Sequence, residues 1–170
     1  MPAQVTTHFC PACWATVDAA ATSCPRCHSN LAALDQRSFT TKLIAALRHP
    51  EPDTRQRATF ILGERREVAA VQGLGDVLLT TSEPFLACEI VTALGKIGGS
   101  EAETLLLRTL DHKAFLVRLA ALQVLGHAGD AAAAALERAA RDASPSVRRL
   151  ARELGAHRRL SGERHGTRGV

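Results

Sequence analysis

The sequence has few aromatic residues, no Tyr and no long apolar run. Aromatic residues make up 4% of its 170 positions, although 46% are hydrophobic. A core must therefore be built from Ala, Leu and Val, a composition that favours helices. The longest apolar stretch, Ala131 to Leu136, has six residues, whereas a membrane-spanning helix needs about 20. Residues Met1 to Cys10 show neither the basic start nor the apolar run of a secretory leader, so we expect a cytoplasmic protein without a transmembrane segment.

Most of the chain lacks a net positive charge. The segment from Arg138 to Val170 carries nine Arg against three acidic residues, which gives +6, and the rest of the chain carries 12 basic and 14 acidic groups, which gives −2. A protein that tracks a nucleic-acid backbone usually spreads its cations over the docking face. Nucleic acid is therefore a possible partner but not the favoured one, and no aromatic residue follows Phe115 to stack a base.

Motifs of catalysis are also absent from the sequence. It contains no HExxH pair, no Gly-rich phosphate loop and no Ser elbow. The seven His are scattered along the chain rather than gathered in a cluster. We therefore expect no enzymatic activity and assign no catalytic residue.

Four of the five cysteines form two close pairs near the start of the chain. Cys10 and Cys13 are separated by two residues, as are Cys24 and Cys27, with ten residues between the pairs. This arrangement is typical of a metal site with four thiolate ligands, and Zn²⁺ accepts such a set tetrahedrally. Iron in a rubredoxin-like site and a redox-active dithiol remain alternatives. Four protein ligands leave no position for water, so we predict one structural zinc ion.

The segment around these cysteines resembles a small zinc ribbon, chiefly through its opening Phe9-Cys10-Pro11-Ala12-Cys13. Ribbons typically place Gly after each Cys pair, whereas this chain has Trp14 and His28 there. Phe9 and Trp14 are expected either to cover the metal site or to be displayed to a partner. The fifth cysteine, Cys88, lies in a helical pattern and is interpreted as an ordinary thiol.

The remainder of the chain repeats itself. Four similar segments read TRQRATFILG from position 54, LACEIVTALG from position 86, VRLAALQVLG from position 117 and VRRLARELG from position 147, so their starts are almost evenly spaced. A shorter apolar helix pattern precedes each segment, and a polar or Pro-containing turn separates the two. Each unit is therefore predicted to be a helical hairpin, and stacked hairpins share one apolar core. Gly63, Gly95 and Gly126 are expected to end the second helices in a left-handed conformation.

The region from about Thr41 to His157 resembles HEAT-like repeats of the phycobilisome-lyase type, with their VR…A…LG signature. The resemblance implies an all-α solenoid of four hairpins. It also implies that Arg55, Arg118 and Arg148 brace neighbouring repeats through acidic partners, although the second repeat has Ala87 at this position. In such stacks the second helices line a concave face that grips proteins. The implied partner-binding strip, which we call the docking strip, comprises Gln56, Phe60, Glu64, Cys88, Thr92, Lys96, Leu119, Gln123 and His127.

These observations predict two modules. We expect a zinc ribbon over residues 1–34, a linker over 35–40, the repeat domain over 41–157 and a basic, disordered tail over 158–170. The expected function is that of a non-enzymatic adaptor or scaffold that binds an unidentified protein. Two alternatives stay open: a nucleic-acid-associated factor that uses the ribbon and the Arg-rich C-terminus, and a lyase-related enzyme subunit.

Overall fold

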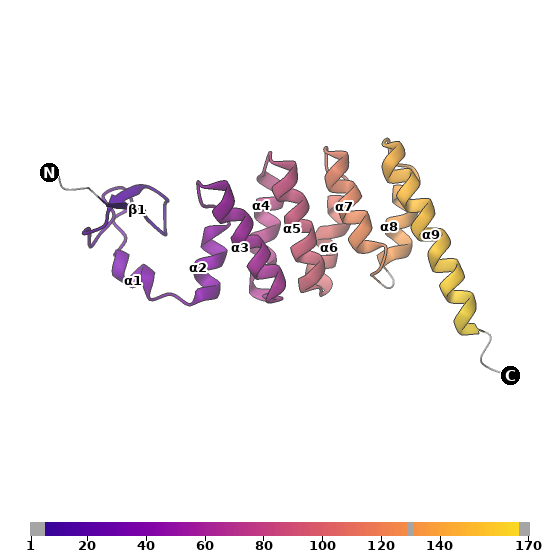
Figure 1. The fold of residues 1–170 in the computed structure, drawn as a ribbon, viewed down its shortest axis with the longest axis horizontal. Coiled ribbons are helices and arrows are strands. Elements are labelled where there is room, and N and C mark those ends of the chain that lie inside the picture. Colours follow the sequence, from indigo (N-terminus) through magenta and orange to yellow (C-terminus); the bar gives the residue numbers. More distant parts are fainter. Residues whose placement is uncertain (1–5, 129–130, 167–170) are drawn as a thin grey trace.

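The computed structural model describes residues 6–128 and 131–166, with side chains to residue 159. A short hairpin comes first, in which β1 (Thr7–Phe9) pairs antiparallel with β2 (Thr16–Asp18). Helices follow: α1 (Leu31–Asp35), α2 (Phe39–Ala46), α3 (Pro52–Glu64), the 3-10 turn η1 (Val68–Ala70), α4 (Val71–Thr80), α5 (Pro84–Ile97), α6 (Ser100–Thr109), α7 (Phe115–Leu125), α8 (Ala131–Ala139) and α9 (Pro145–Gly166). The helix pairs from α2 to α9 stand side by side in one row, with the strands and α1 at one end and α9 at the other (Figure 1).

Four helical hairpins make up this row and confirm the predicted all-α solenoid. They pair α2 with α3, α4 with α5, α6 with α7, and α8 with α9. Proline opens α3 and α5, where its missing N–H costs no helical hydrogen bond. Among the described residues, no helix has both the length and the apolar character needed to cross a membrane. The break between α1 and α2 spans residues 36–38, within the segment 35–40 that the sequence predicts as a linker.

One apolar core runs through all four hairpins. The repeated positions Leu62, Leu94 and Leu125 are all fully buried, as are Val117 and Val147 in the last two hairpins. A single hairpin exposes this face, so only stacking removes it from water. At about 25 cal/mol per Å² of apolar surface, each buried Leu contributes about 2 kcal/mol.

The three repeat glycines serve a purpose different from the predicted one. Gly63 and Gly95 lie inside α3 and α5, and Gly126 follows α7 with a right-handed φ of −58°. A Cβ at Gly63 would lie 2.9 Å from Ala93, and one at Gly95 would lie 2.5 Å from a methyl group of Val124. The prediction of left-handed caps is therefore wrong. Glycine is needed because consecutive second helices approach too closely for any side chain.

The arginines of the repeat signature hold the turns. Arg55 donates to the carbonyl oxygens of His49 and Pro50 in its own repeat and to Glu83 in the next one. Arg118 makes the equivalent contacts to its own turn and to Asp142. Arg148 donates to the carbonyl oxygens of its own turn, at Asp142 and Ala143. The bracing role implied by the resemblance is thus confirmed for Arg55 and Arg118.

Helix α9 extends beyond the last repeat. The sequence predicted a disordered tail from residue 158, but the helix continues to Gly166, so the prediction is corrected for residues 158–166. Residues 167–170 lie outside the described part of the chain. Arg, Leu, Ala and Glu are good helix formers and no Pro interrupts them, so the glycines in this stretch, at about 1 kcal/mol each, do not end the helix.

Candidate metal centre and docking face

The four cysteines predicted as metal ligands converge on one point. All four Sγ atoms lie within 4.8 Å of one another. Cys10 Sγ is 3.7 Å from Cys27 Sγ, and Cys13 Sγ is 3.7 Å from Cys24 Sγ. Four sulfurs at about 2.3 Å from a tetrahedral zinc ion would be about 3.8 Å apart. The cluster therefore has the size of a metal site with four thiolate ligands.

The two Cys pairs form matching loops. Cys10 N donates to Ala15 O at 2.8 Å, and Cys24 N donates to Ser29 O at 3.0 Å. After each pair the chain turns through a left-handed residue, Trp14 or His28, each with φ of 59°. Trp14 and His28 therefore occupy the positions where zinc ribbons typically have Gly. Each adopts a left-handed backbone conformation, which costs about 1–2 kcal/mol of conformational energy for a residue with a Cβ.

The thiols differ in acidity. Hydrogen bonds from the hydroxyl group and backbone of Ser29 lower the pKa of Cys27 to about 6. At Cys13 the backbone hydrogen bond of Ala15 lowers the pKa, but burial and the neighbouring thiols outweigh it and raise the value to about 11. One thiolate thus forms readily at neutral pH, whereas a full set of four needs a cation to compensate their charge.

Phe9 and Trp14 lie against the first repeat. Their ring centroids lie 4.9 and 4.7 Å from that of His49, which belongs to the turn between α2 and α3, and both contacts are edge-to-face. Arg37 adds a hydrogen bond of 3.2 Å to Pro11 O. The sequence suggested that these rings cover the metal site or are displayed to a partner. The contact with His49 is a different one, and it attaches the Cys module to the end of the solenoid.

The docking strip lies along the second helices. Gln56, Phe60 and Glu64 come from α3, the next three members come from α5, and Leu119 and Gln123 come from α7, with His127 just beyond it. Phe60 is 62% exposed. Lys96 pairs with Glu64, and its Nζ lies 5.4 Å above the centroid of the Phe60 ring. Phe60, Thr92 and Lys96 line a hollow of about 130 Å³.

Cys88 is half-buried within this strip. Burial raises the pKa of its thiol, and the neighbouring Glu89 carboxylate adds to the effect. A protonated thiol at neutral pH is a poor nucleophile. This environment agrees with the interpretation of Cys88 as an ordinary thiol.

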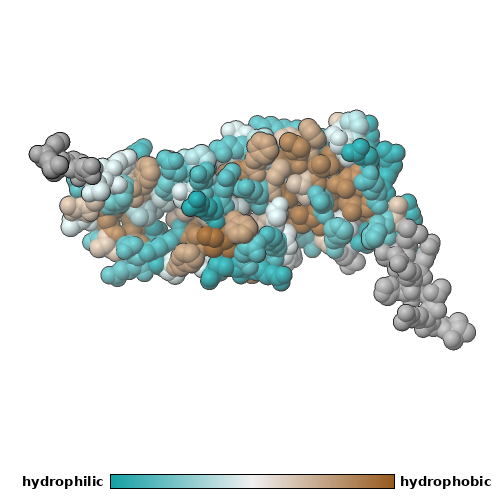
Figure 2. All heavy atoms as spheres, in the orientation of Figure 1, coloured by the Kyte–Doolittle hydropathy of each residue, from teal (hydrophilic) through white to brown (hydrophobic). Residues whose placement is uncertain are grey.

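Three exposed apolar residues on the same side were not included in the strip. Phe85 is 74% exposed, and Phe115 and Leu116 are 45% and 41% exposed. They lie in the first turns of α5 and α7, just before the repeated segments that start at positions 86 and 117. Apolar side chains gather over these two helices in Figure 2. The sequence offered one signal for these residues. Aromatic residues are scarce in this chain, so the two Phe at the starts of second helices could have been singled out as candidate interface residues.

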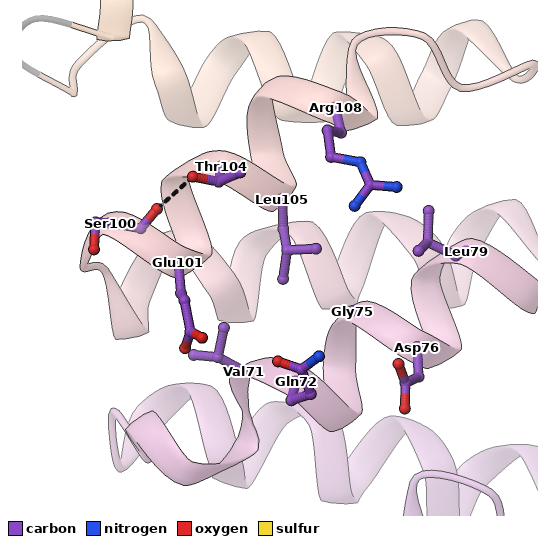
Figure 3. A pocket seen from close by; sticks show the side chains of 10 residues that line it. All are labelled: Val71, Gln72, Gly75, Asp76, Leu79, Ser100, Glu101, Thr104, Leu105 and Arg108. Atoms are coloured by element: carbon purple, nitrogen blue, oxygen red, sulfur yellow. Dashed lines mark hydrogen bonds between the residues drawn. The ribbon is translucent and has the colours of Figure 1, made fainter.

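A larger hollow, of about 340 Å³, lies between the first helices α4 and α6, away from the docking strip. Figure 3 shows Leu79 and Arg108 at one end of it and Glu101 at the other. Asp76 at its edge is already paired with Arg48 at 3.0 Å. No motif in the sequence points to this hollow.

Comparison with known proteins identifies the repeat region. A family profile described as HEAT repeats matches residues 40–113 and 71–155, which together span more than half of the chain. Nineteen chains of solved structures are significantly similar. One comes from the complex of CpcE and CpcF of phycocyanin lyase from Nostoc, with a TM-score of 0.50 and 20% identity over 69% of this chain. The match covers 64% of that chain, less than two thirds of its length, and at this identity it shows the fold alone. No curated protein is significantly similar.

Proposed function

Because the chain belongs to the family of HEAT-repeat proteins, we propose that it is a non-enzymatic adaptor that binds another protein through its second helices. HEAT repeats are generally non-catalytic, and the similar chain from Nostoc was solved as part of a complex of two proteins. The first point favours a non-enzymatic role, and the second supports protein binding, although that complex is a lyase. Such a solenoid acts by preorganised shape, since its face is formed before the partner arrives.

One observation carries this proposal: large apolar side chains are exposed on the second-helix side. Phe60 and Phe85 are 62% and 74% exposed in a chain with few aromatic residues. Exposed aromatic residues are costly in water and enriched in the centres of protein interfaces. Polar members of the docking strip, such as Thr92 and Gln123, would then form the hydrogen-bonding surroundings.

A crosslinking experiment tests the adaptor function. A photoreactive amino acid placed at Gln123 on the second-helix face is expected to give discrete crosslinked proteins in cells that express the chain. The matched control places it at Gln72 on α4, an exposed polar position on the opposite side. Equal crosslinking from both positions, or none from Gln123, would contradict the proposal.

We further propose that the Cys cluster holds one zinc ion and that its role is structural. Four thiolates complete a tetrahedral sphere, so no open position remains for water. The module over residues 1–34 is too small for a sufficient core of its own, and the metal would supply the missing stability. None of the five described cysteines forms a disulfide. Cysteines stay unbridged in a reducing compartment, so the proposed location is the cytoplasm. Metal analysis of the purified chain should give one zinc per chain, and iron or no metal would contradict this.

A second candidate function rests on the arginines of α9. Arg149 and Arg152 are both exposed on this helix, so a phosphate backbone is a possible alternative ligand. Filter binding with single-stranded RNA at low and moderate salt separates the two functions. Retention that falls steeply with salt supports the alternative, and no retention at low salt excludes it.

A further inference from the structure

An apolar patch lies over the N-terminal ends of α5 and α7. We define it as Phe85, Cys88, Phe115, Leu116 and Leu119. Phe85 and Leu116 each stand directly before one of the repeated segments, and Cys88 and Leu119 are each the third residue of that segment, so both pairs occupy equivalent positions in consecutive repeats. Two adjacent helices therefore present matching apolar side chains on the same side, visible as the brown area over α5 and α7 in Figure 2.

The same positions are polar or cationic in the last repeat. The equivalents of Leu116 and Leu119 on α9 are Ser146 and Arg149. The nearest acidic group to Arg149 is Glu153, whose carboxylate is 3.9 Å away, and both side chains are highly exposed. A pair this long and this exposed contributes little. Arg152 donates weakly to the backbone of α9, at 3.4 Å.

The patch is therefore apolar in its centre and positive on its α9 side. Rows of side chains on neighbouring helices form grooves that accept the apolar face of another helix. A partner that places carboxylates beside Arg149 and Arg152 would neutralise charges that lack strong partners within the described chain. Charge complementarity of this kind sets partner choice and orientation.

We propose that the partner presents an amphipathic helix with an acidic flank, whose apolar face packs on Phe85 and Leu116 and whose carboxylates reach Arg149 and Arg152. This inference rests on the proposed adaptor function and specifies the chemistry of the partner. It predicts a preference for acidic over basic helices of equal hydrophobicity.

Two synthetic peptides test the preference on the full, metal-loaded chain. Both are amphipathic helices of the same length with the same Leu face, and one carries Glu where the other carries Lys. Fluorescence anisotropy is expected to show that the Glu peptide binds at least tenfold more tightly than the Lys peptide. Phe85→Asp should weaken the affinity for the Glu peptide about tenfold, an effect typical of the loss of an aromatic anchor. Arg149→Glu combined with Arg152→Glu should remove the preference between the two peptides.

Matched controls come from the opposite side of the solenoid. Leu79→Asp replaces an apolar residue of comparable exposure, 61%, and Arg108→Glu reverses a cation on α6. Neither change should affect binding. Asp at Phe85 adds a negative charge to the first turn of α5, which helices tolerate well, and circular dichroism checks that the fold is kept.

The outcomes separate this inference from the adaptor function. If the two peptides bind equally and Phe85→Asp weakens both, the proposal of an acidic partner is overturned, but apolar docking on this face is not. If Phe85→Asp does not weaken binding of the Glu peptide, the proposed role of Phe85 as an apolar anchor is overturned. Failure of both peptides to bind overturns the inference, while the adaptor function is judged separately by crosslinking at Gln123.

Discussion

Arg118 reaches from α7 across a repeat boundary and holds both carboxylate oxygens of Asp142, through hydrogen bonds of 2.7 and 2.8 Å. The two side chains are only 13% and 10% exposed. The same guanidinium donates to His112 O at 2.7 Å, and Asp142 accepts from Ser144 N at 2.7 Å. One ion pair therefore connects α7, the turn before it and the turn before α9.

Removal of this carboxylate should destabilise the chain. Asp142→Asn leaves the nearly buried Arg118 without its counter-charge, and loss of one partner of a buried pair typically costs about 3–5 kcal/mol. Urea unfolding followed by circular dichroism measures the change. Glu137→Gln is the control, because the Glu137–Arg141 pair is 73% and 80% exposed and should change stability by less than about 1 kcal/mol. Equal effects of the two substitutions would refute the assigned role.

The same pair predicts a dependence on pH. Hydrogen bonds from Arg118 lower the pKa of Asp142 in the folded chain, and the bond from Ser144 N adds to this. A lowered pKa means that the stabilisation is complete above the unfolded value of about 3.9 and is lost as the pH falls through the folded value. The stability difference between the wild type and Asp142→Asn should therefore be constant from pH 7 to 5 and shrink below about pH 4. A difference that shrinks near pH 6 would point to another group.

Close approach of the second helices makes a prediction about glycine. Gly95→Ala would place its Cβ 2.5 Å from a methyl group of Val124, so overpacking should cost about 1–3 kcal/mol. Gly155→Ala in α9 is the contrast, since its Cβ would meet only Arg159, at 3.8 Å. That change should stabilise the helix by about 0.5–1 kcal/mol. Thermal unfolding of both variants provides the measurement, and stabilisation by both would refute the packing argument.

These glycines also show where sequence reasoning stops. The regular repeat interval and the alternation of apolar positions were enough to predict the four hairpins, because both are local patterns. A glycine can be required for a left-handed turn or for close helix packing, and the sequence alone does not distinguish these two reasons. Only the position of Val124, in the following repeat, distinguishes the two at Gly95. The convergence of the four Cys was predictable from their spacing, whereas the contact of Trp14 with His49 depends on how two modules meet.

That contact has a direct optical reporter, because Trp14 is the sole Trp in a chain without Tyr. His49→Ala removes the ring between Phe9 and Trp14, so the Trp14 emission should shift to longer wavelength as the indole gains water. His112→Ala is a close control. His112 Nδ1 accepts a backbone hydrogen bond from Ala114 N just as His49 Nδ1 accepts one from Glu51 N, yet the third repeat carries no Trp. An emission spectrum of His49→Ala that matches the wild type would show that the ring contact is not maintained in solution.

Removal of the proposed zinc ion should act beyond the Cys module. Without the proposed cation the four thiols would no longer hold the two loops together, and Phe9 and Trp14, each adjacent to a cysteine of the cluster, would lose their fixed position against His49. Cys24→Ser, or chelation of the wild type, should therefore speed amide hydrogen exchange in the ribbon and also in α2 and α3. Exchange in α7 and α9 should stay unchanged, because solenoid repeats are coupled mainly to their neighbours. Cys88→Ser, which alters a cysteine outside the cluster, should leave the exchange of α2 unchanged. Protection of α2 and α3 that survives chelation would show that the solenoid end is stable by itself and that the ring contact only tethers the module.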